Sequence, residues 1–461
     1  MKNSIFNSNF LLKLVIPIFF FLLWFFLIGK NFINEFFLID DYHWLREFDY
    51  ENLKNVWYNN WDPDNFETSG YRPVAVYLYH VQGILFDENN FVAYHLFSIV
   101  LMFVLLLTVI QFLNLLNFTK YEICFFSLIF IYSKIFTTLA AWITLNPLIV
   151  CYIFFFLTGI FFIKWTSNFY KNYYILILFF SIFGVLIREE IYHIPIFLFL
   201  TWIYKSSIKE FQINIKKVIL ICAIIFIFFL FLYFLRSVFI STAPQPNFGI
   251  DNILSFLITG VASGLPGGVW TYTFEEKLLQ FFWIVSLFVI CLITIINKNY
   301  NFSFLKKILV LFSLVCLTSL PSLVMRRDFG ILLPTIFSYM IITKIIFNFY
   351  NSSIKKNYKF FIIFFVIISG VYGGYQRSIQ HLHGWSFNSS FMVWLNSEFL
   401  YERRDKKFVT IPEKRKKLAI EKLKNLGIDN RVVTYDEILQ LIKEKKVSSD
   451  IYIPRHFFLK H

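Results

Sequence analysis

Two adjacent aspartates, Asp40 and Asp41, stand in the stretch FFLIDDYHWLREFDY, directly after the first long apolar run of the chain. Like charges at close range raise the pKa of one another's carboxyl groups, and a raised pKa suits a general base in a partly apolar cleft. A solvated helix end is the alternative interpretation of such a pair. The residue types therefore predict proton transfer at the edge of a membrane span.

A second group of charges occupies a short turn between two apolar runs. Arg188, Glu189 and Glu190 stand together in GVLIREEIYHIP. A charged residue costs roughly 2.5–3.5 kcal/mol at the centre of a membrane span, so the turn is expected at a membrane face. An ordinary polar turn is the alternative. We expect the two glutamates to form an acidic part of the same cleft as the aspartates.

Arginines supply the complementary charge. Arg326 and Arg327 are adjacent in PSLVMRRDFGILLP, and Arg72 stands in SGYRPV. The guanidinium group presents a planar fork of donors that holds phosphate oxygens through two parallel hydrogen bonds. These residues, together with Arg188, are the predicted donors to an anionic group such as a phosphate. The alternative for Arg72 is a side chain that reaches the membrane interface.

The composition defines the elements that must position these groups. The chain has 461 residues, of which 58% are hydrophobic, 22% aromatic and only 16% charged. Soluble domains carry about a quarter charged residues. Apolar runs long enough to cross a hydrocarbon core of about 30 Å recur along most of the chain. We therefore predict an all-α polytopic membrane protein.

The hydropathy pattern predicts about eleven membrane-spanning helices. The first apolar run has no small-residue cleavage site after it, so we expect a retained signal-anchor helix. The predicted spans lie near residues 10–29, 91–116, 121–136, 146–163, 173–187, 191–204, 218–240, 278–296, 308–325, 329–349 and 360–375.

Lysine and arginine fall in different loops. With a cytoplasmic N-terminus, the predicted cytoplasmic segments carry lysines and no arginine, while the opposite loops carry most of the arginines. Basic residues in short loops mark the cytoplasmic side. This distribution predicts a multi-pass protein of a bacterial-type inner or plasma membrane. The arginines then bind an anion at the outer face, or else anchor lipid headgroups and pair with acids.

The spans divide the chain into two predicted domains. Residues 1–375 form the transmembrane domain, whose first external segment, 31–90, includes the proline-initiated apolar stretch PVAVYLYHVQGILF. That stretch is too short to cross and is expected to lie along the outer interface. Residues 376–461 are predicted to form a small extracytoplasmic α/β tail.

Several classes of partner are not predicted. The net charge of +14 resides mainly in lysines that orient the spans, so no nucleic-acid partner is expected. All five cysteines lie in apolar runs, which supports neither a disulfide framework nor a cysteine metal site. The histidines lack a compact ligand spacing, so no metal and no cofactor is predicted from His43, His80, His95 and His193.

The motifs together resemble the GT-C superfamily of integral membrane glycosyltransferases, such as the protein O-mannosyltransferases and the lipid A aminoarabinose transferase. The resemblance rests on DDYHWL after the first span, YRPV, the turn IREEIYHIP and the late turn RRDFGILLP. It covers roughly residues 36–205 and 320–340. The chain departs from the family in having two acids in the IREE turn, where one is usual, and in a tail without tetratricopeptide repeats.

The resemblance implies a role for each matching residue. Asp40 would be the general base and Asp41 a supporting acid that positions the acceptor. Glu189 or Glu190 would line the cleft, and Arg326 or Arg327 would contact the donor phosphate. The implied reaction transfers a sugar, with inversion, from a polyprenyl-phosphate donor to a hydroxyl of a glycan, lipid or protein. Most mannosyltransferase-type members need no metal, although some oligosaccharyltransferases bind a divalent ion through similar acids.

Three other classes remain as alternatives. A ligase or polymerase of polyprenyl-linked glycans also uses outer-face arginines, concentrated in one large late loop. A lipid or sugar transporter would carry charges or broken helices near mid-span. A structural membrane protein would use the charges only as helix ends. The early acid pair favours the glycosyltransferase.

Overall fold

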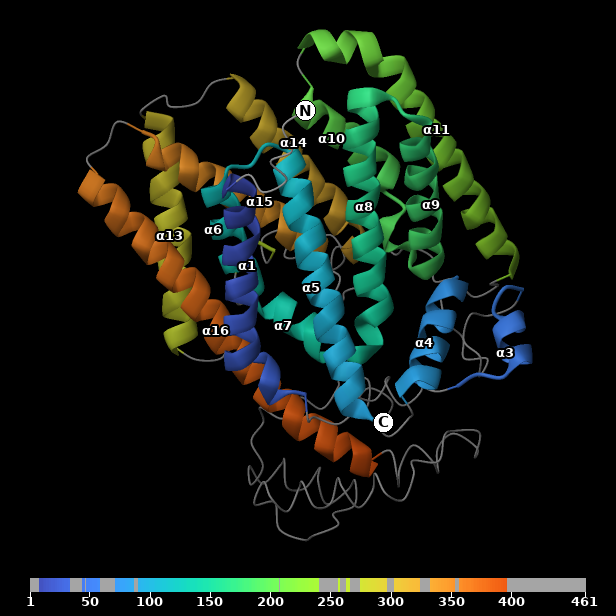
Figure 1. Ribbon diagram of the computed structural model, residues 1–461. Coiled ribbons are helices and arrows are strands. Elements are labelled where there is room, and N and C mark those ends of the chain that lie inside the picture. The colour runs from blue at the N-terminus through green and yellow to red at the C-terminus, as the bar shows by residue number, and fades with distance from the viewer. Residues whose placement is uncertain are drawn as a thin grey trace.

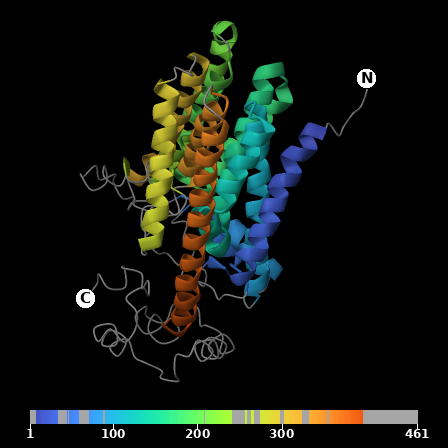
Figure 2. The same cartoon turned by 90° about the vertical axis from the view of Figure 1, so that its left-hand side faces the viewer.

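The computed structural model describes residues 8–33, 44–45, 47–58, 71–86, 90–206, 208–239, 256–257, 263–265, 274–296, 302–323, 332–352 and 356–395. This part of the chain is helical and contains no strand. Most of its helices pack roughly parallel or antiparallel to one another in a single layered bundle (Figures 1 and 2). The described residues do not include Asp40, Asp41, Arg326, Arg327 or residues 396–461, which make up most of the predicted α/β tail.

Eight of the described helices are long and apolar enough to cross a membrane, which establishes an all-α polytopic architecture. They lie in α1 (Ser8–Leu27), α5 (Phe91–Leu115), α8 (Asn146–Asn168), α11 (Ile208–Phe239), α13 (Phe274–Ile296), α14 (Phe302–Ser319), α15 (Leu332–Tyr350) and α16 (Lys356–Leu395). Two other predicted spans correspond to shorter helices, α9 (Lys171–Ile187) and α10 (Ile194–Lys205). Helix α16 continues beyond residue 375, the predicted end of the transmembrane domain.

The span predicted over 121–136 is a broken one. Helices α6 (Lys120–Ile131) and α7 (Lys134–Ala141) meet at an angle of 59°. The hydroxyl of Ser133 accepts a hydrogen bond from the backbone N–H of Phe136 and so caps the start of α7. A serine that caps a new helix offers the backbone an alternative to continuing the old one. Counting this pair as one span gives nine spans among the described residues.

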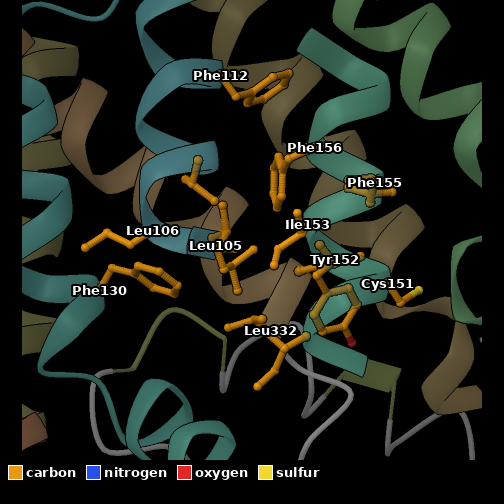
Figure 3. Close-up of a cluster of buried hydrophobic side chains, with 14 of the residues drawn as sticks. Leu105, Leu106, Phe112, Phe130, Cys151, Tyr152, Ile153, Phe155, Phe156 and Leu332 are labelled. Carbon is orange, nitrogen blue, oxygen red and sulfur yellow. The ribbon is translucent and has the colours of Figure 1, made fainter. Parts of the chain in front are cut away.

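The hydrophobic core surrounds α8. Of the candidate spans, those of α8 and α15 are the most buried, each with 72% of its apolar window inside the protein. Figure 3 shows Leu105 of α5, Phe156 of α8 and Leu332 of α15 among the side chains of this core. Phe112 contacts Phe156 with ring centroids 5.4 Å apart. The core therefore joins three parts of the chain that are distant in sequence.

The outer helices expose their apolar side chains. Phe19 and Phe26 on α1, Phe288 on α13, and Phe360 on α16 are all more than half exposed. Water would penalise such a surface, whereas lipid tails are as apolar as these side chains. The exposed ring of phenylalanines is therefore the lipid-facing surface of the bundle.

The two ends of the bundle differ in their cations: most described lysines lie at one end, whereas Arg72 and Arg188 lie at the other, together with a few lysines such as Lys54. The lysine end is the end at which α6 and α9 begin, and it includes Lys120 and Lys171. The turn end is the opposite end, where α9 ends in Arg188 and where α4 (Pro73–Phe86) follows Arg72. Figure 1 shows α3 (Tyr50–Asn55) and α4 at the turn end, at the lower right. The separation of lysine and arginine predicted from the loops thus corresponds to the two ends.

Helices α13 and α16 pack through a glycine. A Cβ atom built on Gly370 would lie 2.4 Å from the ring of Trp283, which itself donates a hydrogen bond to the carbonyl of Gly264. We expect Gly370→Ala to lower the free energy of unfolding by about 1–3 kcal/mol, because the fixed ring leaves no room for a methyl group.

The matched control is Gly373→Ala on the same helix, where the new methyl group would lie an ordinary 3.6 Å from Leu279. Alanine favours helix by about 1 kcal/mol over glycine, so this variant should be as stable as the wild type or more so. Thermal unfolding of both variants in detergent measures the difference. Equal stability of the two would contradict the close packing at Gly370.

Candidate functional site

The turn between α9 and α10 lies inside the bundle, short of the level at which α8 begins. Helix α9 has 17 residues and packs beside α8, which has 23, so its end stops about 9 Å short of the start of α8 at 1.5 Å per residue. The contact of the Cys151 thiol with the carbonyl oxygen of Arg188, 3.8 Å apart, agrees with this depth, since Cys151 lies in the second turn of α8. The 3₁₀ turn η3 (Glu189–Ile191) is therefore set back from the end of α8, a position we call the recess, and its charged side chains are largely buried.

A glycine allows the turn to close tightly. A Cβ atom on Gly184, in the last turn of α9, would lie 2.6 Å from the Cδ1 atom of Ile191. Pro195, in the first turn of α10, suits a helix start because proline needs no hydrogen-bond acceptor there. The local sequence thus directs the chain out of α9 and back into α10 within six residues.

Arg72 closes the recess from the side. Its Nε atom donates to Oε2 of Glu189 at 2.7 Å, and its Nη2 atom donates to Oε1 at 2.5 Å. This is the bidentate geometry in which arginine and carboxylate interact most strongly. The Arg72 side chain is 10% exposed and that of Glu189 is 19% exposed, so the pair is shielded from water. Because Arg72 directly precedes α4, the pair ties that helix to the turn.

A second ion pair lies within the turn itself. Nη2 of Arg188 is 3.1 Å from Oε1 of Glu190, and both side chains are largely buried. Arg72, Arg188, Glu189 and Glu190 were predicted to share one cleft, and the structure brings all four together as two ion pairs. We call these four residues the charge cluster. It is neutral as a whole, because two guanidinium groups balance two carboxylates.

The two glutamates differ in what their oxygens can still bind. Both oxygens of Glu189 are engaged by Arg72. Burial raises the pKa of the Glu189 carboxyl, but the charge and hydrogen bonds of Arg72, with a further contribution from Arg188, outweigh burial and hold this pKa at about 2. Among the described residues, Oε2 of Glu190 is buried and accepts no hydrogen bond. Glu189 is therefore a structural anion, while Glu190 retains an open acceptor.

His193 follows the turn, in contact with the backbone of Glu190, and was not among the predicted site residues. Its ring lies against Phe155 of α8, with centroids 5.5 Å apart. Its Nε2 atom is buried without a hydrogen-bond partner among the described residues. Burial lowers the pKa of His193 to about 4, and the backbone of Glu190 opposes this only in part. A neutral imidazole and an open carboxylate oxygen thus belong to the same turn, and no sequence spacing indicated this.

The described residues next to the acid pair contact this end of the bundle. Phe32 packs against His95 of α5 with centroids 5.7 Å apart, and Trp44 stacks on Tyr79 of α4 at 5.3 Å. The hydroxyl of Tyr79 donates to the carbonyl of Thr144 at 2.7 Å, which holds α4 against the start of α8. Tyr79 also lies near Arg72.

A buried amide network secures the same corner. The side chain of Asn146, at the start of α8, donates to Oε1 of Gln82 on α4 at 2.8 Å. Its own Oδ1 atom accepts a hydrogen bond from the hydroxyl of Ser98 on α5. Buried amides make such bonds because an unsatisfied one costs free energy. The network fixes α4, α5 and α8 relative to one another beneath the charge cluster.

The pKa values of His193 and Glu189 predict two separate losses of folding stability as the pH is lowered. The unfolded state binds a proton at His193 below about pH 6.5 and at Glu189 below about pH 4.5, whereas in the folded state the pKa values are about 4 and about 2. Folding stability is therefore expected to fall from about pH 6.5 to 4 through His193, and from about pH 4.5 to 2 through Glu189.

Each transition lowers the free energy of unfolding by about 3 kcal/mol. The pKa of each group differs by about 2.5 between the unfolded and folded states, and one pKa unit corresponds to about 1.36 kcal/mol. Thermal unfolding of the purified protein from pH 7.5 to 4.5 measures the first transition. His193→Gln should flatten the curve over this range, and an unchanged slope in that variant would rule out His193 as its source.

No known protein family, curated protein or solved structure matches the chain. Among the described residues, no group of three or more histidine, cysteine, aspartate or glutamate side chains is arranged to hold a metal ion. The class that the fold defines is thus a polytopic helical membrane protein with a recessed charge cluster at one end.

Proposed function

We propose that this protein is a membrane glycosyltransferase that moves a sugar from a polyprenyl-phosphate donor to an acceptor hydroxyl at the outer membrane face. The recessed charge cluster carries the proposal. It places two arginines and an open carboxylate oxygen beside a lipid-facing bundle surface, where a donor with a long apolar tail and a charged head can bind.

The lysine distribution supports the location of the site. Lysines gather at the end opposite the cluster, and basic loops stay on the cytoplasmic side. If the N-terminal end of α1 is placed in the cytoplasm, the charge cluster faces the extracytoplasmic side. Helix α4 exposes Val81, Ile84 and Leu85 and is too short to cross, so it suits the outer interface beside the site.

The proposed reaction uses the acid pair as base. The acceptor hydroxyl attacks the anomeric carbon, the bond from that carbon to the phosphate oxygen breaks, and Asp40 takes the hydroxyl proton. The transition state resembles an oxocarbenium ion, and the configuration inverts. The departing phosphate keeps the electron pair and gains negative charge, which arginine donors stabilise. Asp41 positions the acceptor.

The ion pairs refine the roles of the arginines. Arg72 and Arg188 each already face a glutamate, so we assign them mainly to fixing the shape of the turn. Arg326 and Arg327 are then the principal ligands of the donor phosphate. The segment that contains them precedes Leu332, which belongs to the same buried cluster as Tyr152 of α8 (Figure 3). Glu190 accepts a hydrogen bond from a sugar or acceptor hydroxyl.

The position of Trp44 supports a role for the acid pair at this site. Trp44 follows Asp41 by three residues and stacks on Tyr79, which is held beside the start of α8. Two Cα atoms three residues apart are separated by no more than about 11 Å. On this basis we propose that the acid pair acts together with the charge cluster.

A transporter of lipid-linked sugars is the second candidate. The break between α6 and α7 favours it, because broken spans provide helix ends that bind substrates in transporters. One assay separates the two functions. Membranes with the protein receive polyprenyl-phosphate donors carrying labelled mannose, glucose or aminoarabinose, with endogenous acceptors present.

A glycosyltransferase transfers the label from at least one donor to a lipid, glycan or protein in a protein-dependent manner. A transporter instead moves the intact donor between leaflets of sealed vesicles and leaves the sugar on its phosphate. Donor movement without sugar transfer would overturn the proposed function in favour of transport.

A further inference from the structure

A second concentration of charge lies at the lysine end, where α6, α10, α14 and α15 meet. Lys306 and Lys307 are on the second turn of α14, and Tyr204 is near the end of α10. The Nζ atom of Lys307 lies 5.7 Å from the centre of the Tyr204 ring. The Nζ atom of Lys306 donates to the carbonyl of Ser206 at 2.8 Å. Both lysines are therefore held against the end of α10.

The nearby acid is already committed to other partners. Oε1 of Glu122 accepts a hydrogen bond from Lys344 of α15 at 2.8 Å. Oε2 of Glu122 accepts from the backbone N–H of Thr119 at 2.7 Å and completes the cap of α6. Lys344 also lies 3.9 Å from the centre of the Phe118 ring. Glu122 thus neutralises Lys344 and leaves the other cations uncompensated.

Two positive charges remain at this place. Within the described residues, neither Lys306 nor Lys307 forms an ion pair. Each lysine lies within electrostatic range of another cation, Lys306 of Lys307 and Lys307 of Lys344. Like charges held together repel, and the repulsion is relieved when an anion binds between them.

A buried hydroxyl points to the same conclusion. Tyr204 is only 3% exposed, and its hydroxyl makes no hydrogen bond to any described residue. The phenol lies near Lys307 and within electrostatic range of Glu122. A buried hydroxyl without a partner costs free energy, so its position beside the lysines indicates a ligand that accepts a hydrogen bond from it.

We infer that Lys306, Lys307 and Tyr204 form a binding site for a phosphate group at the lysine end. The two ammonium groups supply donors only and the hydroxyl can donate one more hydrogen bond, while a phosphate supplies acceptor oxygens with negative charge. Basic pockets between membrane helices bind the headgroups of anionic lipids on the cytoplasmic side. This site lies at the opposite end from the charge cluster and is independent of the proposed glycosyl transfer.

The test measures binding to the full-length protein in detergent by native mass spectrometry. The probes are phosphatidic acid and, as a phosphate-free control with the same tails, diacylglycerol. We expect the wild type to retain phosphatidic acid in preference to diacylglycerol. Lys306→Gln with Lys307→Gln should weaken phosphatidic acid binding about 30-fold, at roughly fivefold per lysine. Tyr204→Phe keeps the ring and should weaken it about threefold to tenfold.

A second pair of neighbouring lysines provides the matched control. Lys216 and Lys217 are exposed on α11 at the same end, and Lys217 lies over the ring of Phe169. Replacing both with glutamine removes the same charge and should leave the affinity within about twofold, as for exposed charges in general. Unfolding temperatures of all variants establish that the fold is intact.

The source of the phosphate is distinguished by adding excess inorganic phosphate. Displacement of the lipid shows that the site takes a phosphate group from either source, whereas no displacement restricts it to lipid headgroups. Equal losses in both lysine double variants would reduce the site to general surface charge and overturn the inference. No preference of the wild type for phosphatidic acid over diacylglycerol, or full binding by Tyr204→Phe, would also overturn it.

Discussion

Asp40→Asn is expected to lower sugar transfer by about 100- to 10,000-fold, the contribution of a positioned general base. The amide has nearly the shape of the carboxylate but cannot accept the proton of the attacking hydroxyl. The effect should fall on the rate of transfer at saturating donor, because the donor phosphate is bound by other groups. Asp41→Asn should reduce activity less and should raise the acceptor concentration needed, as expected of a group that positions the acceptor.

Asp49→Asn is the matched control for this experiment. Asp49 is an exposed acid that follows the pair in sequence, and its side chain caps α3 by accepting from the backbone N–H of Asn52 at 2.7 Å. Asparagine caps helices as well as aspartate, so this variant should keep full activity and a normal fold. The measurement is transfer of labelled sugar in membranes with matched protein levels. Full activity in both Asp40→Asn and Asp41→Asn would reduce the pair to a polar helix end.

Arg72→Met is expected to lower the free energy of unfolding by about 3–5 kcal/mol, because it leaves the carboxylate of Glu189 without its partner in a recess. Glu189→Met should cost a similar amount for the converse reason. The double variant Arg72→Met with Glu189→Met removes both charges together. We expect it to be more stable than either single variant, since apolar side chains of similar volume can replace such a pair at little cost.

A double-mutant cycle of thermal unfolding in detergent measures this coupling. Lys54→Met on α3 removes an exposed cation at the same end and should change stability by less than about 1 kcal/mol. Additive losses in the double variant would mean that the two side chains act separately, contrary to their bidentate contact. The pair also holds α4 over the turn, so the single variants should lose transfer activity together with stability.

Hydropathy alone determined the class of this protein and the approximate position of most of its helices. Runs of apolar residues must satisfy their backbone polar groups internally, and in a membrane only helices do so for single segments. The spans predicted near 10–29, 91–116 and 146–163 therefore correspond closely to α1, α5 and α8. The same reasoning put Arg72 and the 188–190 turn at one end, because loop position follows from the count of crossings.

Other features depended on interactions that local sequence does not encode. The bidentate contact joins Arg72 to Glu189, 117 residues apart, and four charges in two short segments allow several pairings. Only the packing of α4 against α9 selects this one. The break at Ser133 was likewise missed, because the polar interruption of Ser133 and Lys134 is short and apolar residues continue on both sides of it.

Tertiary structure also decided which carboxylate stays available. Glu189 and Glu190 are adjacent and chemically identical, yet one is held by two hydrogen bonds from Arg72 and the other keeps a buried oxygen open. Their difference arises from the direction in which the 3₁₀ turn points each side chain and from the nine-ångström depth, about six helical residues, by which α9 stops short of α8. The sequence by itself determined which chemical groups meet at the turn end; the lengths and packing of the helices decided which of them face one another.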